Sequence, residues 1–197
     1  MSVLLQQLSA EMADAVLRAR RVLVRIRSGR GDGAGIIVHP DGLIVTNAHV
    51  VGHGQVEVTL PDGSSVPGEV LAHDTDLDLA AVSVRGGGLL AIELADSRRL
   101  QPGEWVFALG HPWGVAGAVT AGVVTHVGRQ AADLPPSRHE WVTASLKLRP
   151  GYSGGPMVDS RGRLVGLNTI MAGLGVGLAV PTHVIVAFLR DRLRAAA

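Results

Sequence analysis

The sequence predicts an all-β protein that consists of two small barrels with a short helix at each end. From residue 22 onward, short β-branched runs alternate with glycines and turn dipeptides, which is typical of small barrels. The hydrophobic fraction of 47% and the positive mean hydropathy of +0.29 indicate a globular chain rather than a disordered one. At 197 residues, the chain is long enough to bury a core without a metal or disulfides.

Residues 21–97 are predicted to form the first barrel. The turns Pro40-Asp-Gly42 and Pro61-Asp-Gly63 separate its strands with residues that favour tight reversals. The expected strands are Val22–Arg27, Ala34–His39, Leu43–Thr46, Val56–Leu60, Val66–His73 and Leu79–Val84, with a further candidate at Leu89–Leu94.

Residues 98–181 are predicted to form the second barrel. The polar segment Asp96 to Gln101 leads into it from the first. The expected strands are Trp105–Leu109, Ala118–Gly128, Trp141–Ser145, Pro156–Asp159, Leu164–Ile170 and Gly175–Val180. A ligand site is expected in the cleft between the two barrels, because clefts between domains are a usual place for such sites.

A helix is predicted at each end of the chain, over residues 1–20 and 182–197. In the first helix, Ser2 is a candidate N-cap, and apolar residues recur at helical spacing. We expect this apolar face to pack against the barrels or against another subunit; its residues are Val3, Leu4, Leu8, Met12, Val16 and Leu17. Thr182 opens the second helix, whose apolar face, Val184, Phe188, Leu189 and Leu193, should pack on the body of the protein.

The segment Arg149-Pro-Gly-Tyr-Ser-Gly-Gly-Pro156 presents a serine in a glycine-rich turn. Gly151 allows a sharp bend that can direct the amides of Gly151 and Ser153 toward a developing oxyanion. Gly154 and Gly155 keep the approach to the hydroxyl free of side chains. Ser153 is therefore a candidate nucleophile, although such a turn is often only a turn.

A serine nucleophile needs a base, and the base needs an orienting carboxylate. His49 follows a β-branched run and lies where that strand ends. Asp78 lies at the entrance of the apolar run Leu79 to Val84, where a buried carboxylate requires hydrogen bonds that an imidazole can supply. Asp74 and Asp76 are alternatives for the carboxylate, and Asp78 is preferred because it directly precedes Leu-Ala-Ala-Val.

Five segments in order resemble the signatures of the HtrA (Deg) serine proteases, a branch of the chymotrypsin-like fold. They are Thr46-Asn-Ala-His-Val-Val51, Asp78-Leu-Ala-Ala-Val82, Gly110-His-Pro-Trp-Gly114, Val119-Thr-Ala-Gly-Val-Val124 and Gly151-Tyr-Ser-Gly-Gly-Pro156. The resemblance implies two six-stranded antiparallel β-barrels of chymotrypsin type. It also implies His49 as general base, Asp78 as its orienting group, Ser153 as nucleophile, and an oxyanion hole formed by the amides of Gly151, Tyr152 and Ser153.

The pocket for the side chain before the scissile bond should be formed by the segment preceding Ser153 and by the strand that ends at Ile170. The candidate substrate-binding residues are Lys147, Leu148, Asn168, Thr169 and Ile170. Their surroundings are small and apolar, so a compact aliphatic side chain is expected there. Lys147 departs from the family pattern: pointing inward, it would favour an acidic side chain or fill the pocket, whereas a solvated Lys147 would do neither.

Composition narrows the possible partners. A net charge of +1 argues against dedicated nucleic-acid binding. The chain has no cysteine, and its other histidines lack the spacing of a zinc site, so neither a metal nor a cofactor is expected. No run is long enough to span a membrane, and the first residues do not read as a signal peptide. This predicts a cytoplasmic protein, or a periplasmic or secreted one if a leader was removed.

Two functions follow from the sequence. The first is a serine endopeptidase that acts on proteins, in particular unfolded or damaged ones, through an acyl-enzyme intermediate. The second is a binding or chaperone module with weak catalysis, because the residues before Ser153 depart from the family pattern. The resemblance also implies a homo-oligomer, namely a trimer formed through the N-terminal segment. A PDZ domain commonly follows the protease domain in the resembled family, but none is expected within these 197 residues.

Overall fold

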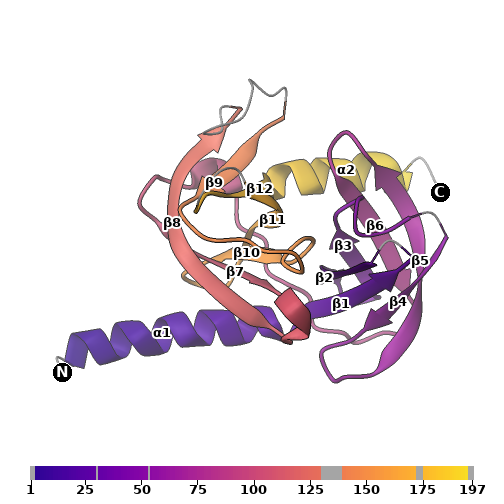
Figure 1. The fold of residues 1–197 in the computed structure, drawn as a ribbon, viewed down its shortest axis with the longest axis horizontal. Coiled ribbons are helices and arrows are strands. Elements are labelled where there is room, and N and C mark those ends of the chain that lie inside the picture. Colours follow the sequence, from indigo (N-terminus) through magenta and orange to yellow (C-terminus); the bar gives the residue numbers. More distant parts are fainter. Residues whose placement is uncertain (1–2, 30, 53, 130–138, 172–174, 195–197) are drawn as a thin grey trace.

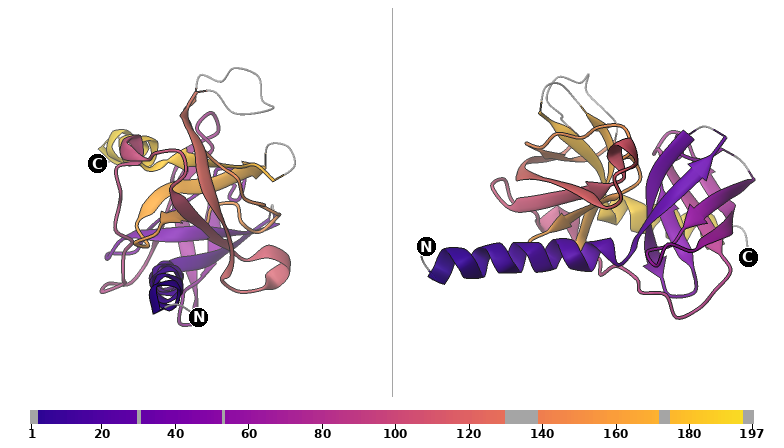
Figure 2. Two further views of the ribbon diagram at one scale, coloured as in Figure 1. Left: turned by 90° about the vertical axis from the view of Figure 1, so that its left-hand side faces the viewer. Right: turned by 60° about the horizontal axis from the view of Figure 1, so that its bottom comes forward.

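The computed structural model describes residues 3–29, 31–52, 54–129, 139–171 and 175–194. Two closed antiparallel barrels of six strands each lie side by side (Figures 1 and 2). The first has the strand order β1-β2-β3-β6-β5-β4, and the second β10-β11-β12-β9-β8-β7. This confirms the predicted fold class.

The strand bounds follow the predicted ones closely. In the first barrel they are β1 Leu23–Ser28, β2 Gly31–His39, β3 Leu43–Thr46, β4 Gln55–Thr59, β5 Ser65–Asp74 and β6 Leu79–Val84. In the second barrel they are β7 Trp105–Gly110, β8 Ala118–Gly128, β9 Trp141–Ala144, β10 Pro156–Asp159, β11 Leu164–Met171 and β12 Gly177–Pro181.

Small residues at inward positions let the first barrel close. A Cβ atom at Gly35 would lie 2.7 Å from the Ile26 side chain and 2.9 Å from that of Ile44. At Gly68, a Cβ atom would lie 2.8 Å from the Val82 side chain. The interior space is therefore already filled by the branched residues of neighbouring strands, as close packing requires.

One apolar core contains residues of both barrels. Ile26 and Ile44 of the first barrel belong to the same buried cluster as Leu109 and Leu167 of the second. All four side chains are inaccessible to solvent. Because this cluster is continuous, it fixes the position of one barrel against the other, and residues from both can meet in one site.

The prediction of a seventh strand at Leu89–Leu94 is wrong, because no strand covers these residues. Leu94 forms only an isolated parallel bridge with Leu164. The segment bonds to single residues on each side: the Ile92 N–H donates to the Ile37 carbonyl, and the Leu164 N–H donates to the Glu93 carbonyl. The segment is apolar because it passes from one barrel to the other and packs between them. The short 3-10 helix η1, Ser97–Arg99, follows it.

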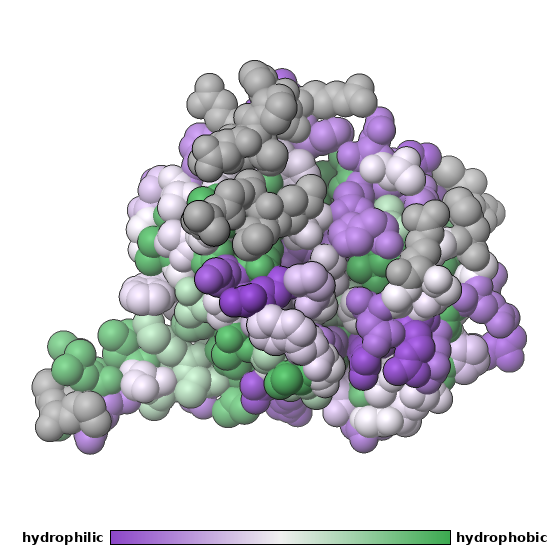
Figure 3. All heavy atoms as spheres, viewed as in Figure 1, coloured by the Kyte–Doolittle hydropathy of each residue, from purple (hydrophilic) through white to green (hydrophobic). Residues whose placement is uncertain are grey.

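Helix α1, Val3–Arg20, projects from the barrels along most of its length (Figures 1 and 2). Its fully buried residues are Ala15 and Ala19, near the end where it contacts β10 and β7. Further out, Leu4 is 72% exposed and Leu8 46% exposed, and Figure 3 shows apolar residues among the polar ones on the projecting part. The predicted packing against the body thus holds only for the C-terminal part of this helix.

Helix α2, Thr182–Arg194, packs on the body of the protein as predicted. Ile185 and Phe188 are buried in the shared core. The Thr182 hydroxyl donates to the Leu164 carbonyl at 2.9 Å and ties the start of the helix to β11. Among the described helices, neither is long and apolar enough to cross a membrane.

Candidate active site

His49 and Asp78 are joined on the first barrel. His49 Nδ1 lies 2.9 Å from Asp78 Oδ1 and 2.8 Å from Oδ2, and the His49 backbone N–H donates to Oδ1 at 3.0 Å. The Asn47 side-chain amide donates to the Asp78 carbonyl at 2.9 Å. Asp78 has a left-handed backbone with φ of 52°, a conformation that is uncommon outside glycine. The carboxylate thus holds both the ring and the backbone of one histidine.

Asp74, one of the two alternative carboxylates, is engaged in contacts away from His49. Asp74 Oδ2 accepts a hydrogen bond from Arg192 of α2 at 2.6 Å, and Oδ1 accepts the N–H groups of Asp76 and Leu77. Burial alone would raise the pKa of Asp74, but the Leu77 N–H and the Arg192 guanidinium outweigh it and hold the pKa below its usual range. Asp78 is the carboxylate that the structure places against His49.

Thr169 links this pair to Ser153 on the second barrel. Its hydroxyl donates to Asp78 Oδ2 at 2.5 Å, and its backbone carbonyl accepts from Ser153 Oγ at 3.3 Å. Within the described part of the chain, no hydrogen bond joins Ser153 to His49 directly. The sequence predicted Thr169 only as a substrate-binding residue, because no local sequence pattern marks its contact with Asp78.

Close backbone packing brings the serine turn against the first barrel. The Ala34 N–H of β2 donates to the Ser153 carbonyl at 2.9 Å. A Cβ atom at Gly154 would lie 2.1 Å from the Ala34 carbonyl oxygen and 2.4 Å from Thr46 Oγ1. Only glycine permits this approach, so Gly154 allows Ser153 to sit at the junction where His49 also lies.

The turn that precedes Ser153 is held by its own backbone. Gly151 has φ of 100°, in the region that favours glycine. The Tyr152 N–H donates to the Arg149 carbonyl, and the Gly155 N–H donates to the Tyr152 carbonyl, both at 3.0 Å. The Tyr152 amide is therefore engaged within the turn, which leaves those of Gly151 and Ser153 as candidate oxyanion donors.

The predicted substrate-binding residues differ in burial and in the contacts of their side chains. Leu148 is buried, with Leu146, beside Gly177, where a Cβ atom would lie 2.5 Å from Leu146 and 3.0 Å from Leu148. Lys147 is exposed between them, so its side chain is not buried in this wall. Asn168 is fully buried and its amide donates to the Leu109 and Pro156 carbonyls, so its side chain supports the barrel. The side chain of Ile170 lies outside the described part of the structure.

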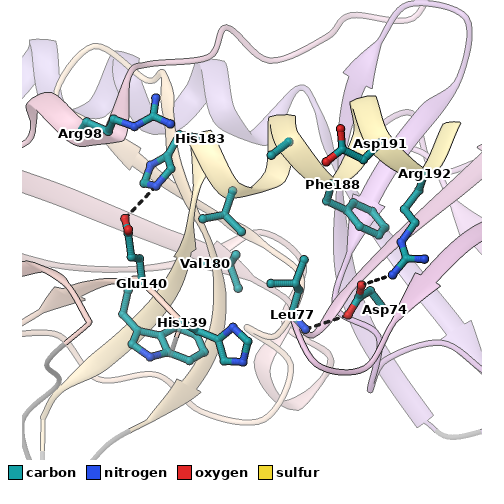
Figure 4. Close-up of a pocket in the computed structure, with 13 residues that line it drawn as sticks. Asp74, Leu77, Arg98, His139, Glu140, Val180, His183, Phe188, Asp191 and Arg192 are labelled. Carbon is teal, nitrogen blue, oxygen red and sulfur yellow. Dashed lines mark hydrogen bonds and ion pairs between the residues drawn. The ribbon is translucent and has the colours of Figure 1, made fainter. Parts of the chain in front are cut away.

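A second serine–histidine–carboxylate arrangement lies near α2. Ser97 Oγ is 2.9 Å from His183 Nδ1, and Glu140 Oε2 is 2.9 Å from His183 Nε2. His183 and Glu140 line a cavity of about 570 Å³ with an apolar floor that includes Val180 and Phe188 (Figure 4). Ser97 is fully buried and accepts the His183 N–H at the start of α2, so its hydroxyl is inaccessible to a substrate.

Two antiparallel six-stranded barrels, with a histidine–aspartate pair on one and a serine turn from the other, define the class of trypsin-like peptidases. The family model described as "Trypsin-like peptidase domain" matches residues 33–167. The chain belongs to this family, and its relatives place it in the HtrA/Deg branch that the sequence motifs indicated.

Named relatives agree with this placement. "Putative serine protease HhoB" of Synechocystis sp. is 40% identical over 157 residues, which cover 77% of this chain and 38% of that protein. "Probable periplasmic serine endoprotease DegP-like" of Chlamydia pneumoniae is 36% identical over 156 residues, covering 76% and 32%. The structure of "HtrA-type protease AlgW with decapeptide" superimposes with a TM-score of 0.84 at 25% identity, covering 94% of this chain and 68% of that one. The chain thus spans less than half the length of the Synechocystis and Chlamydia relatives.

His111 contacts the serine turn through its backbone, since its N–H donates to the Gly151 carbonyl at 2.8 Å, and its side chain is partly buried. Its Nδ1 accepts the Gly117 N–H at 3.3 Å, which requires that Nδ1 be unprotonated. Its Nε2 is buried without a hydrogen-bond partner among the described residues. Burial lowers the pKa of the His111 imidazole from its ordinary value of 6.5. The folded protein therefore favours the neutral ring.

This predicts a loss of stability in mild acid that depends on His111. Because the pKa is lower in the folded state, the stabilising contribution is fully present above pH 6.5 and is lost as the pH falls through the folded value. His111→Asn keeps an acceptor but does not titrate. The melting temperature, measured between about pH 7.5 and 5, should fall more steeply for the wild type than for His111→Asn. Equal slopes would contradict a buried neutral His111.

Proposed function

We propose that the protein is a serine endopeptidase in which His49, Asp78 and Ser153 form the catalytic triad. The observation that supports this most is the contact of Thr169 with both halves of the site: its hydroxyl binds Asp78, and its carbonyl accepts from Ser153. Thr169 thereby contacts Ser153 directly and His49 through Asp78. The order of the three residues along the chain, histidine, aspartate and then serine, matches that of serine peptidases on this fold.

The proposed reaction begins when Ser153 Oγ leaves the Thr169 carbonyl and turns toward His49. The bond that it leaves is long, at 3.3 Å, so little is lost by rotation. His49 Nε2 takes the hydroxyl proton as Oγ attacks the peptide carbonyl, and Asp78 stabilises the imidazolium. The Gly151 and Ser153 amides bind the oxyanion. His49 then protonates the leaving amine, and water releases the acyl group by the same steps in reverse.

The proposed substrates are peptide bonds of unfolded or damaged proteins. The HtrA-type protease AlgW is described with a decapeptide in one solved structure and with a tripeptide in another. A weakly catalytic binding or chaperone module is the second candidate. It is favoured by one observation, namely that Ser153 Oγ is bonded to Thr169 rather than to His49.

The first experiment separates the two candidates by labelling with a fluorophosphonate probe and by casein digestion. Wild-type protein should be labelled once and should digest casein. Ser153→Ala should abolish labelling and lower turnover by at least about a thousandfold, because the nucleophile is removed. Ser160→Ala is the matched control, since Ser160 is an exposed serine in the turn after β10. Labelling that persists in Ser153→Ala, or that never occurs in the wild type, would exclude catalysis by Ser153.

We also propose that the specificity pocket accepts a compact aliphatic side chain. Leu146 and Leu148 are 4% and 3% exposed and form an apolar wall beside Gly177. Cleavage of a peptide library should favour Val, Ala or Leu before the scissile bond, and Lys147→Ala should leave this profile unchanged. Leu148→Ala should raise kcat/KM about tenfold for peptides with a larger side chain before the scissile bond, because a few methylenes change binding in an apolar pocket by about this factor. A preference for Asp or Glu that disappears in Lys147→Ala would show that Lys147 points inward instead.

The projecting part of α1 supports a homo-oligomer, and we propose the trimer that the family resemblance implies. Exposed apolar patches of this kind mark protein–protein contacts. Light scattering coupled to size-exclusion chromatography should give three copies for the wild type. Leu4→Gln combined with Leu8→Gln should give a monomer, whereas Leu90→Gln, at an exposed leucine elsewhere, should not. A wild-type monomer at all concentrations would contradict the trimer.

The compartment stays a prediction. The name of the Chlamydia relative describes that protein as periplasmic. Either a cytoplasmic or an exported location for this chain agrees with the proposed activity.

A further inference from the structure

A histidine of strand β5 contacts the turn that carries His49. His73 Nε2 lies 3.1 Å from the Ala48 carbonyl oxygen. A carbonyl oxygen can only accept a hydrogen bond, so Nε2 carries a proton and donates it. His73 pairs with Ala80 of β6, and Ala80 pairs with Thr46, the last residue of β3. The His73 side chain therefore reaches past β6 to the residues that follow β3.

The turn between residues 47 and 50 presents the proposed base. The Val50 N–H donates to the Asn47 carbonyl at 3.2 Å, which closes the turn around Ala48 and His49. Strand β3 ends at Thr46, and β4 begins at Gln55. The central peptide group of the turn, between Ala48 and His49, therefore has no place in a strand ladder, and other groups must satisfy its N–H and C=O.

Two side chains of the β5–β6 hairpin bind this peptide group. Its N–H donates to Asp78 Oδ1 at 3.0 Å, and its C=O accepts from His73. A trans peptide group is planar, and its N–H and C=O point in opposite directions. The two hydrogen bonds hold the plane from opposite sides. Because the plane leads directly into the His49 Cα, its orientation sets where the imidazole side chain starts.

Burial makes the contact with His73 difficult to replace. Ala48 is 2% exposed, so its carbonyl has little access to water as an alternative donor. His73 itself is partly exposed and lines an open hollow of about 580 Å³ together with Leu77 and Arg192. A smaller side chain at position 73 therefore removes the donor without opening a closed cavity in the apolar core.

We propose that His73 is a positioning residue that holds the Ala48–His49 peptide group and thereby the ring of the general base. The proposal rests on the proposed peptidase function. His73 contacts the backbone at Ala48 and acts through His49, so it is not a catalytic residue. In the free protein, Ser153 Oγ is bonded to the Thr169 carbonyl. Proton transfer therefore requires the His49 ring to be in place when the hydroxyl turns toward it.

Two amide variants separate this hydrogen bond from other effects of substitution. In His73→Gln, the side-chain amide places a donor about where Nε2 lies, whereas in His73→Asn the amide is one methylene shorter and does not reach Ala48. On a fluorogenic peptide, His73→Asn should lower kcat about three- to tenfold, which is the worth of one hydrogen bond. KM should change less than about twofold, because substrate binding is not involved. His73→Gln should keep at least about half of the wild-type kcat.

His39→Asn is the matched control, because His39 is a histidine of the same barrel whose side chain is 59% exposed. It should keep kcat and KM at wild-type values. Unchanged kinetics in His73→Asn, or an equal loss in His73→Asn and His73→Gln, would overturn the proposal, since the donor would then be irrelevant. A rise in KM with kcat unchanged would also overturn it and would assign His73 to substrate binding instead.

Hydrogen exchange of the His49 amide gives a readout that does not depend on activity. This N–H is bonded to Asp78 and exchanges when the turn opens. It should exchange about three- to tenfold faster in His73→Asn than in the wild type, His73→Gln or His39→Asn. The Ile37 amide, which donates to the Val22 carbonyl at 3.0 Å, is the reference and should keep its rate.

Unchanged exchange at His49 would refute the role of His73. Equal acceleration at His49 and Ile37 would show a general loss of stability and would refute it as well. If the wild type showed no turnover, the peptidase proposal would fail, and the exchange experiment would still decide whether His73 holds the turn.

Discussion

The Asp78 carboxylate is the interaction on which the rest of this site depends. It accepts hydrogen bonds from the His49 backbone, the His49 ring and the Thr169 hydroxyl. A carboxylate whose side chain is 20% exposed needs such donors, because burial of a charge without them costs several kcal/mol. Two of the donors belong to the first barrel and one to the second. The group that orients the histidine therefore also joins the two barrels.

Glycines make this meeting of the barrels possible. Gly154 packs against the Ala34 carbonyl and the Thr46 hydroxyl, and a Cβ atom at Gly155 would lie 2.0 Å from the Leu109 carbonyl oxygen. A Cβ atom at Gly110 would lie 2.5 Å from the Gly151 carbonyl oxygen. The glycines of this turn are thus needed for two reasons. It exposes the serine hydroxyl, and it lets the turn lie directly on the backbone of both barrels.

Local sequence patterns predicted the strands well, since β-branched runs and Pro-Asp-Gly turns act over a few residues. They failed at Leu89–Leu94, where apolar residues serve a single bridge between barrels rather than a strand. For the outer part of α1, helical spacing showed which residues share an apolar face, but it did not decide whether the barrels or another subunit cover that face.

For the site, the pattern around Asp78 selected the carboxylate that the structure places against His49, while Asp74 is bound to Arg192 of the distant α2. Thr169 was assigned to the substrate pocket because it lies on the strand that ends at Ile170, which is expected to line that pocket. Its contact with Asp78 spans 91 residues and depends on how the barrels dock. The same holds for His73, whose contact with Ala48 no spacing rule predicts.

The tautomer of His49 tests the central role of Asp78 most directly. Nitrogen NMR of protein labelled in its histidine rings reports which ring nitrogen carries the proton. We predict a protonated Nδ1 in the neutral ring, held by Asp78, and loss of that preference in Asp78→Asn, where an amide replaces the carboxylate. A wild-type His49 with its neutral-state proton on Nε2 would contradict the account, because Nε2, the proposed base, could not then accept the proton of Ser153.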